Sequence, residues 1–473
     1  MKIILNTIFN LICWCTISLQ AQISLPAFFG DNMVIQQKEI VSIWGKDIPN
    51  TTINLITSWG STAKTVSNAQ GEWHTSIKTG AASFQTETIT IIGSNRKTIK
   101  NILIGEVWFC SGQSNMEMPL NGFRKSPVLN AHKYMAIADN TNIRLFNNPR
   151  TASVSPNYNV DGRWAVSSAT SAKTFSAVGY MFGAKLYENL NVPIGIIESS
   201  WGGTKIECWI PKAYLLKTKS ITIPVDLSKE EAKQKKPSFL YNAMIHPFKD
   251  FKVKGVLWYQ GESNRLNPHA YRDHMKDLIK SWRSQWKEDD LPFYFVQIAP
   301  FDYVKYKKAT TNGPDLIREA QLKAAFEIHN TGLVVTTDAG NCSDIHPSKK
   351  ELIAQRLVNW ALTEQYHFKH LQFKSAVLEK MAIKKEKVLL KFKFQENDYF
   401  IKSDDVKGFA IASNDQVFYP AKVSFNADNK TLIIHSDKVK DPVAIRYGFE
   451  DCFESNLKTK SGLPIPVFRT DVW

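Results

Sequence analysis

The chain has 473 residues, of which 43% are hydrophobic and 22% are charged, a composition typical of a globular protein with about two or three domains. Its net charge of +15 comes largely from lysines spread over many segments. No arginine-rich block or nucleic-acid-binding module accompanies this charge, so we interpret it as a solvated basic surface and exclude nucleic acid as a partner.

Residues 1–21 resemble a secretory signal peptide. Lys2 precedes an apolar run from Ile3 to Leu19, and small residues near Ala21 suit a cleavage site. A membrane anchor is the alternative, but the run is short and interrupted by polar residues, and no later stretch is long enough to span a bilayer. We therefore expect an exported protein, secreted or periplasmic, without a membrane span.

Residues 22–101 read as a small β-sandwich-like domain at the N-terminus. Short runs with strand character cover 34–44, 52–59, 73–77 and 86–92, and turn signals such as Gly30-Asp31-Asn32 separate them. The function of this region cannot be read from its residues.

Over residues 102–368, predicted strands alternate with predicted helices. Short apolar runs predict buried strands at 102–109, 194–197, 253–259, 293–298 and 333–336, and apolar residues at helical spacing predict helices over 175–190, 271–286 and 353–361. This alternation favours a parallel sheet covered on both faces. The polar, lysine-rich segment 212–240 is interpreted as an insertion or a lid-like loop.

Residues 369–473 return to strand signals, at 388–394, 408–412, 431–435 and 443–447. They predict a C-terminal β-rich region, either a second β domain or strands that join the first. We find no internal repeat.

Beyond residue 21 the chain contains four scattered cysteines, namely Cys110, Cys208, Cys342 and Cys452. Their spacing fits neither a disulfide framework nor a zinc site. We expect most of them to be small buried residues. No metal or cofactor is expected.

The stretch 109–118 follows the first predicted strand of the α/β region and contains Ser114. Open α/β sheets hold their ligands at the ends of such strands, so Ser114 is the candidate nucleophile. A serine needs a base and an orienting group to act in this way. The alternative is that Ser111, Ser114 and Asn115 only cap the following helix.

Two further loops carry candidate donors for an oxyanion. Gly202 and Gly203 follow the strand at 194–197, and adjacent glycines bring bare N–H groups close to a ligand. Gln260 and Asn264 follow the strand at 253–259, and either could supply a side-chain amide. Glu262 lies between them and is predicted either to position this loop or to act as a general acid or base.

The last loop, at 344–347, supplies a candidate base. Pro347 favours an extended conformation for His346, and an extended Asp344-Ile345-His346 segment projects both side chains to one face. The Asp344 carboxylate could then orient the imidazole while the other ring nitrogen faces Ser114. Asp338 is a competing orienting carboxylate, and a plain surface loop is the alternative reading.

Together the stretches 112–116, 201–204, 258–264 and 344–347 resemble the SGNH-type hydrolase superfamily, specifically the sialate O-acetylesterase family, and the tail from 446 to 471 is also similar to it. The resemblance implies an α/β fold in which a flavodoxin-like, three-layer α/β/α catalytic domain over 102–368 carries accessory all-β domains. It also implies removal of O-acetyl groups from an O-acetylated sugar or glycan.

The resemblance assigns Ser114 as the nucleophile, His346 as the base and Asp344 as the orienting group. The Asp-x-His spacing is one residue shorter than the common Asp-x-x-His. The oxyanion donors implied are the Ser114 N–H, a Gly202 or Gly203 N–H, and a side-chain amide. Because 260–262 replaces the usual Gly-x-Asn block, Gln260 is the first choice for that amide and Asn264 the second.

Several alternatives remain. The substrate could be an acetylated sialic acid, whose carboxylate would suit Arg144, Arg163 or Arg265, or an acetylated plant polysaccharide such as xylan. A glycosidase using Glu262 with Asp344 would leave Ser114 and His346 unexplained. A non-catalytic sugar-binding protein is the third class, and the oligomeric state stays open.

Overall fold

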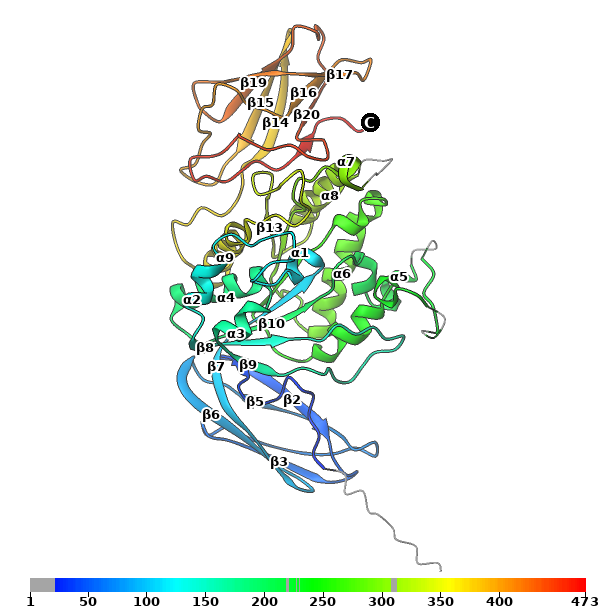
Figure 1. The fold of residues 1–473 in the computed structure, drawn as a ribbon, viewed down its shortest axis with the longest axis vertical. Coiled ribbons are helices and arrows are strands. Elements are labelled where there is room, and N and C mark those ends of the chain that lie inside the picture. Colours follow the sequence, from blue (N-terminus) through cyan, green and yellow to red (C-terminus); the bar gives the residue numbers. More distant parts are fainter. Residues whose placement is uncertain (1–21, 218–220, 227, 229, 308–312) are drawn as a thin grey trace, which may run out of the picture.

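The computed structural model describes residues 22–217, 221–226, 228, 230–307 and 313–473. The predicted signal peptide at 1–21 lies outside these residues, as do parts of the predicted insertion at 212–240. The described chain forms a mixed α/β fold with several sheets, which confirms the expected α/β class. In Figure 1 the N-terminal strands lie at one end, the α/β region in the middle and the C-terminal strands at the other end.

The central sheet has the strand order β13-β12-β11-β7-β10-β8-β9, and every neighbouring pair is parallel except β8 with β9. The carboxyl ends of its parallel strands therefore meet at one edge, where ligands bind in such sheets. Its strands are β7 (Arg96–Gly112), β8 (Asn140–Asn147), β9 (Trp164–Ser167), β10 (Ile194–Ser200), β11 (Gly255–Tyr259), β12 (Phe293–Val296) and β13 (Thr331–Val334).

Helices pack on both faces of this sheet because successive strand side chains point to opposite sides. Trp108 belongs to one core cluster, together with apolar residues of α4 (Ala177–Leu190) and α9 (Lys350–Tyr366). Phe109 belongs to the other, together with residues of α6 (Tyr271–Trp286) and α8 (Pro314–Glu327). The remaining short helices are α1 (Ser114–Glu117), α2 (Ala131–Ala136), α3 (Ala169–Lys173), α5 (Lys212–Leu215), α7 (Tyr303–Lys307), η1 (Ile206–Trp209), η2 (Lys233–Lys235), η3 (Tyr241–Ile245), η4 (His246–Phe248), η5 (Glu262–Asn264) and η6 (Pro268–Ala270).

The N-terminal strands share β7 with the central sheet. The first part of β7 pairs antiparallel with β6, and its last part pairs parallel with β10 and β11. The expected boundary between 101 and 102 therefore falls inside one strand. The other N-terminal strands are β1 (Val34–Gln36), β2 (Ile40–Lys46), β3 (Thr52–Thr57), β4 (Thr62–Val66), β5 (Glu72–Lys78) and β6 (Ser83–Ile92).

The C-terminal strands form two small sheets, ordered β14-β15-β19-β18 and β17-β16-β20-β21, around a shared apolar core that includes Phe392, Tyr447 and Phe468. Four of the strands match predicted runs; β14, β17, β18 and β21 were not predicted. The strands are β14 (Val377–Lys384), β15 (Lys387–Lys393), β16 (Phe409–Ala412), β17 (Phe418–Pro420), β18 (Lys422–Phe425), β19 (Thr431–His435), β20 (Ala444–Tyr447) and β21 (Phe468–Arg469).

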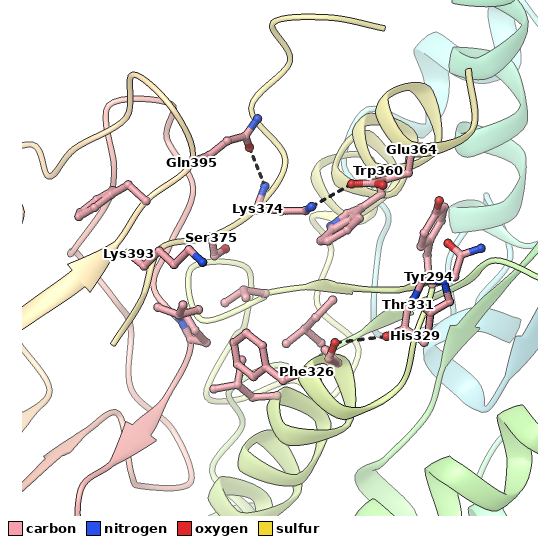
Figure 2. A pocket seen from close by; sticks show the side chains of 18 of the residues that line it. Tyr294, Phe326, His329, Thr331, Trp360, Glu364, Lys374, Ser375, Lys393 and Gln395 are labelled. Carbon is pink, nitrogen blue, oxygen red and sulfur yellow. Dashed lines mark hydrogen bonds and ion pairs between the residues drawn. The ribbon is translucent and has the colours of Figure 1, made fainter. Parts of the chain in front are cut away.

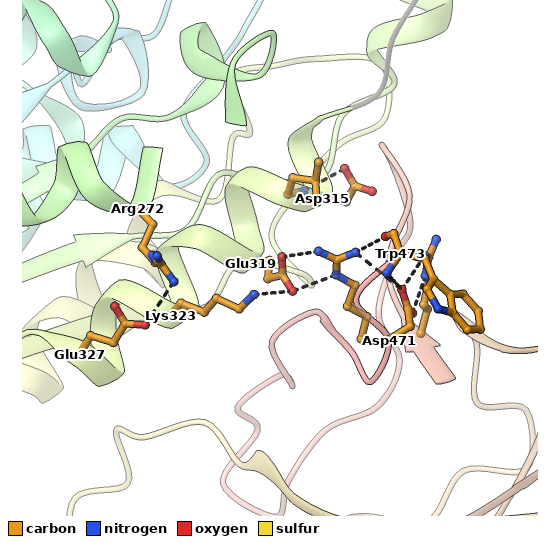
Figure 3. Close-up of polar contacts among 10 residues, drawn as sticks. Arg272, Asp315, Glu319, Lys323, Glu327, Asp471 and Trp473 are labelled. Atoms are coloured by element: carbon orange, nitrogen blue, oxygen red, sulfur yellow. Dashed lines mark hydrogen bonds and ion pairs between the residues drawn. The ribbon is translucent and has the colours of Figure 1, made fainter. Parts of the chain in front are cut away.

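The C-terminal region is joined to the α/β region by an ion pair and a disulfide. Arg469 of β21 donates two hydrogen bonds to Glu319 of α8, at 3.0 and 3.2 Å (Figure 3). Cys342 and Cys452 form a disulfide with their Cα atoms 5.6 Å apart, and neither residue is buried, so the expectation that most of the four cysteines are buried does not hold for this pair. Their sequence separation of 110 gave no sign of this proximity, which only the folded chain creates. The other two, Cys110 and Cys208, are buried and free, in line with the expectation that most of the cysteines are small buried residues.

A cavity of about 810 Å³ lies at this junction, between the edge strand β13 and the C-terminal strands. Figure 2 shows Trp360 on its wall, with Lys374 reaching Glu364 at 2.9 Å. None of the candidate site residues predicted from the sequence lines this cavity.

Within the described part of the chain, none of the helices combines the length and apolar character needed to cross a bilayer.

Candidate active site

Ser114 lies just past the carboxyl end of β7, at the start of α1. The chain turns at Gly112, whose φ of +140° and whose ideal Cβ position 2.2 Å from the Tyr259 carbonyl oxygen admit only glycine. Gln113 occupies the N-cap without a side-chain capping bond, and Ser111 Oγ donates to the Ser199 carbonyl at 2.6 Å. The alternative in which these serines only cap the helix is therefore wrong.

His346 meets Ser114 at this edge. Its Nε2 lies 3.0 Å from Ser114 Oγ, although the two residues are 232 positions apart. Both side chains are partly buried, and the Phe123 ring packs edge-on against the imidazole with centroids 5.0 Å apart. A hydroxyl and an imidazole at this distance have the geometry of a nucleophile and its general base.

Asp344, rather than Asp338, accompanies the imidazole. Asp344 Oδ1 accepts the backbone N–H of His346 at 2.9 Å and lies 3.9 Å from His346 Nδ1, which is an ion-pair distance and not a hydrogen bond. Asp338 instead forms a two-pronged pair with Arg356, at 2.8 Å for each contact, and lies 3.2 Å from Lys458 Nζ. The structure thus separates the two carboxylates that the sequence left in competition.

The Gly202-Gly203 turn lies against the serine. An ideal Cβ on Gly202 would stand 3.2 Å from Ser114 Cβ, and one on Gly203, at φ +71°, would face open space. The Gly202 N–H already donates to the carboxylate of Glu117, which also pairs with Arg150. The Gly202 N–H, a predicted oxyanion donor, therefore lies beside the nucleophile, but in this structure it is hydrogen-bonded to the Glu117 carboxylate.

Gln260 and Asn264, the predicted side-chain donors, brace a neighbouring loop. Gln260 Nε2 donates to the Thr204 carbonyl at 3.1 Å and to Asn264 Oδ1 at 2.8 Å, so both of its amide hydrogens are used. Asn264 Nδ2 donates to Glu207 at 2.8 Å. Both side chains are buried, and the structure does not bring either amide to Ser114 Oγ.

Glu262 is buried beneath the site. Its Oε1 accepts a hydrogen bond from Asn115 Nδ2 at 2.6 Å, and burial raises the pKa of its carboxyl. With an exposed fraction of 3%, Glu262 cannot flank a sugar bond together with Asp344, so the glycosidase alternative gains no support.

Two of the three arginines proposed for a substrate carboxylate contact other groups of the protein. Arg144 is buried and donates to Asn101, and the Arg265 guanidinium stacks 5.0 Å from the Tyr303 ring centroid. Arg163 is exposed immediately before β9. An exposed cation linked to the site is Arg150, whose side chain is 58% exposed and pairs with Glu117. Its loop position gave no periodic signal, so the sequence could not single it out.

Two other residues at the site were missed. Asn115 was read as a helix cap, but its side chain forms hydrogen bonds with three groups next to Ser114. They are Glu262, the Ile345 carbonyl and Lys350. Lys350 begins α9 and is fully buried. A lysine in the first turn of a helix faces an unfavourable dipole, and this was the one signal that could have marked it.

Comparison with known proteins gives consistent results. Residues 104–362 match the family model described as carbohydrate esterase, sialic acid-specific acetylesterase. The chain is 29% identical to the sialate O-acetylesterase of Homo sapiens, covering 85% of this chain and 82% of that protein, and 29% identical to that of Pongo abelii, covering 98% and 96%. The crystal structure of a carbohydrate acetylesterase from Xanthomonas citri is similar with a TM-score of 0.86 and 32% identity, covering 96% of this chain and 100% of that one.

Proposed function

Since the chain belongs to the carbohydrate esterase family of sialic acid-specific acetylesterases, we propose that it is an exported, secreted or periplasmic sialate O-acetylesterase with Ser114 as its nucleophile. The contact of 3.0 Å between Ser114 Oγ and His346 Nε2 is the observation that carries the proposal. It supplies the activated hydroxyl that acyl transfer needs, at the sheet edge where ligands bind.

In the proposed reaction, Ser114 Oγ attacks the acetyl carbonyl while His346 takes its proton. The tetrahedral intermediate expels the sugar oxygen, which receives that proton from His346, and leaves an acetyl group on Ser114. Water then attacks the acetyl-enzyme with His346 again as the base. Acetate leaves, and Ser114 regains its proton. Asp344 contributes a negative charge 3.9 Å from the Nδ1 atom, which favours the imidazolium that forms in each step.

The backbone N–H groups of Ser114 and the Gly202-Gly203 turn are the proposed oxyanion donors. Ser114 is the first residue of α1, where backbone N–H groups have no partner within the helix. The Gly202 N–H would have to exchange the Glu117 carboxylate for the oxyanion. Gln260 and Asn264 act indirectly in this proposal, by holding the segment that follows the turn.

We assign the α/β region to the flavodoxin-like, three-layer SGNH type, with accessory β domains at both ends. Its support is the parallel sheet between two pairs of helices, α4 with α9 and α6 with α8. The shared strand β7 joins the N-terminal strands to the nucleophile directly.

Acetate release from acetylated sialic acid and from acetylated xylan, compared side by side, tests the substrate class. The relative from Xanthomonas citri is described only as a carbohydrate acetylesterase, so a plant polysaccharide is the second candidate. Faster release from the sialic acid supports the proposal, whereas release from xylan alone replaces it with the second candidate.

The nucleophile is tested on a chromogenic acetyl ester with Ser114→Ala. The variant is expected to lose kcat by about 10⁴-fold or more, as for nucleophile removal in other serine hydrolases. Ser343→Ala is the matched control, because this exposed serine lies in the His346 loop and bonds only Asn341 among the described residues. Near wild-type turnover by Ser114→Ala would contradict the proposal.

A further inference from the structure

A lysine with no role in the proposed chemistry is buried behind the Ser114–His346 pair. Lys350, at the start of α9, has no exposed surface, and its Nζ donates to Asn115 Oδ1 at 2.5 Å. The ammonium also lies 5.3 Å from the ring centroid of Tyr259. Burying a lysine is costly and rare without a partner, so this contact requires an explanation.

The contact fixes the amide of Asn115 in one orientation. Asn115 Nδ2 donates to Glu262 Oε1 at 2.6 Å and to the Ile345 carbonyl at 3.1 Å. While Lys350 is protonated and Glu262 is ionised, the ammonium can only donate, whereas the carboxylate and the Ile345 carbonyl can only accept, so a flipped amide would then lose all three bonds. The carboxamide therefore has its oxygen and both its hydrogens engaged.

The Asn115 amide is adjacent in sequence to Ser114 and bonded next to His346. Asn115 directly follows Ser114, and Ile345 directly precedes His346. The hydrogen bond from Asn115 to the Ile345 carbonyl is thus a bridge one residue away from each member of the pair. We propose that Lys350, acting through the oriented amide of Asn115, is a positioning residue that sets the separation of Ser114 Oγ and His346 Nε2; this inference rests on the proposed esterase function.

The charges around Lys350 agree with this role. Burial lowers the pKa of Lys350 to about 7, while Glu262 and Asp344 raise it in part. Glu262 is buried on the other side of the same amide, and its Oε2 has no hydrogen-bond partner among the described residues. The two charged groups therefore compensate each other across Asn115, and removing either one leaves the other buried without its counterion.

The test uses Lys350→Met and Asn115→Asp in the full-length protein. Lys350→Met keeps the length of the side chain but removes the donor, and Asn115→Asp keeps the acceptor for Lys350 but cannot donate to Ile345. Each is expected to lower kcat by about 10–10²-fold, since a misplacement of about 1 Å has effects of this size, with KM changed by less than about threefold. The rate at which a fluorophosphonate labels Ser114 is expected to fall by the same factor.

Lys349→Met is the matched control. It removes the same charge at the neighbouring position, where Nζ donates to the carbonyl of Asp338 and not to Asn115. We expect kcat and the labelling rate of this variant to stay within about twofold of the wild type, since it leaves the contacts of Ser114 and His346 intact.

If Lys350→Met does not fold, as judged by thermal unfolding, the Lys350→Met/Glu262→Gln double variant removes both charges and keeps an acceptor for Asn115. A folded variant, single or double, with wild-type kcat and labelling rate overturns the inference, as does a folded Asn115→Asp with both unchanged. Failure of the proposed function is distinguishable, because the wild type would then release no acetate from acetylated sialic acid, whatever the labelling rates of the variants.

Discussion

The loops after β11 and β13 reach the same edge of the sheet, but their side chains take different directions. The loop at 335–349 carries His346 to Ser114, whereas the loop at 260–264 turns Gln260 and Asn264 toward the segment 204–207. The sequence motifs identified both loops. The difference shows that a motif locates a loop at the site without settling which of its side chains face the reacting atoms.

The two loops are also held by different parts of the molecule. Residues 335–349 are fastened to the C-terminal region, through the disulfide of Cys342 with Cys452 and the ion pair of Asp338 with Lys458. The loop at 260–264 is held within the α/β region, where the Tyr271 hydroxyl donates to Gln260. Substitutions that loosen the C-terminal region are therefore expected to displace His346. Substitutions at Gln260 are expected to displace the segment that follows the Gly202-Gly203 turn.

The largest expected effect is on stability, from Asp338→Asn. This variant leaves Arg356 buried without its counterion and is expected to cost about 3–5 kcal/mol at pH 7 in denaturant unfolding. Burial acts to raise the pKa of Asp338, but Arg356 and Lys458 hold it below its usual value of 3.8. The stabilisation by the ionised Asp338 is thus fully present above pH 3.8 and is lost as the pH falls through the lower pKa that Asp338 has in the folded protein. The difference in stability between Asp338→Asn and the wild type therefore shrinks in acid. An equal difference at all pH values would contradict the assignment.

Removal of the disulfide is next in size. Cys342→Ser/Cys452→Ser opens a link between residues 110 positions apart and is expected to cost about 2–4 kcal/mol of unfolding free energy. Because Cys342 lies four positions before His346, kcat on an acetyl ester is expected to fall as well. Cys110→Ala/Cys208→Ala, at the buried free cysteines, is the comparison for activity. Wild-type stability after disulfide removal would show that the disulfide does not contribute to holding this loop.

Gln260→Leu distinguishes a structural role of Gln260 in its loop from a direct role as an oxyanion donor. Losing its three hydrogen-bond partners is expected to cost about 1–3 kcal/mol of stability, measured as a lower midpoint of thermal unfolding. An oxyanion donor would behave in the opposite way, with kcat reduced by about 10²–10³-fold and stability unchanged. That second outcome would restore Gln260 as a direct participant.

The smallest expected effect is that of Asp344→Asn on kcat. Because the carboxylate lies 3.9 Å from His346 Nδ1, we expect a loss of about tenfold, well short of the roughly 10⁴-fold loss that follows when a closely bonded triad aspartate is changed. Asn keeps an oxygen for the backbone N–H of His346, so the fold of the loop is expected to survive. A loss approaching 10⁴-fold would mean that Asp344 closes onto the imidazole during the reaction.

The sequence predicted those elements whose local pattern was strong. Helix α6 was expected at 271–286 and is found there, because its aromatic and aliphatic residues recur on one face. Strand β8 and helix α8 were missed, since the first begins with polar residues and the second buries Arg318 and Gln321 among small apolar side chains.

For the site, the predicted meeting of Ser114 with His346 followed from strand ends that share an edge. The long-range partners could not be predicted in the same way. Lys350 with Asn115, and Cys342 with Cys452, are pairs chosen by the folded chain, and neither pair has a periodic or spacing signal.

The most direct test of the account is to trap the acyl-enzyme. The wild-type protein is mixed with an acetyl ester, quenched in acid during turnover and digested, and the mass of one acetyl group is located on its peptides. The account predicts that the acetyl group is on Ser114 and that no such adduct forms in Ser114→Ala. An acetyl group on another residue, or undiminished acetate release by Ser114→Ala, would contradict it.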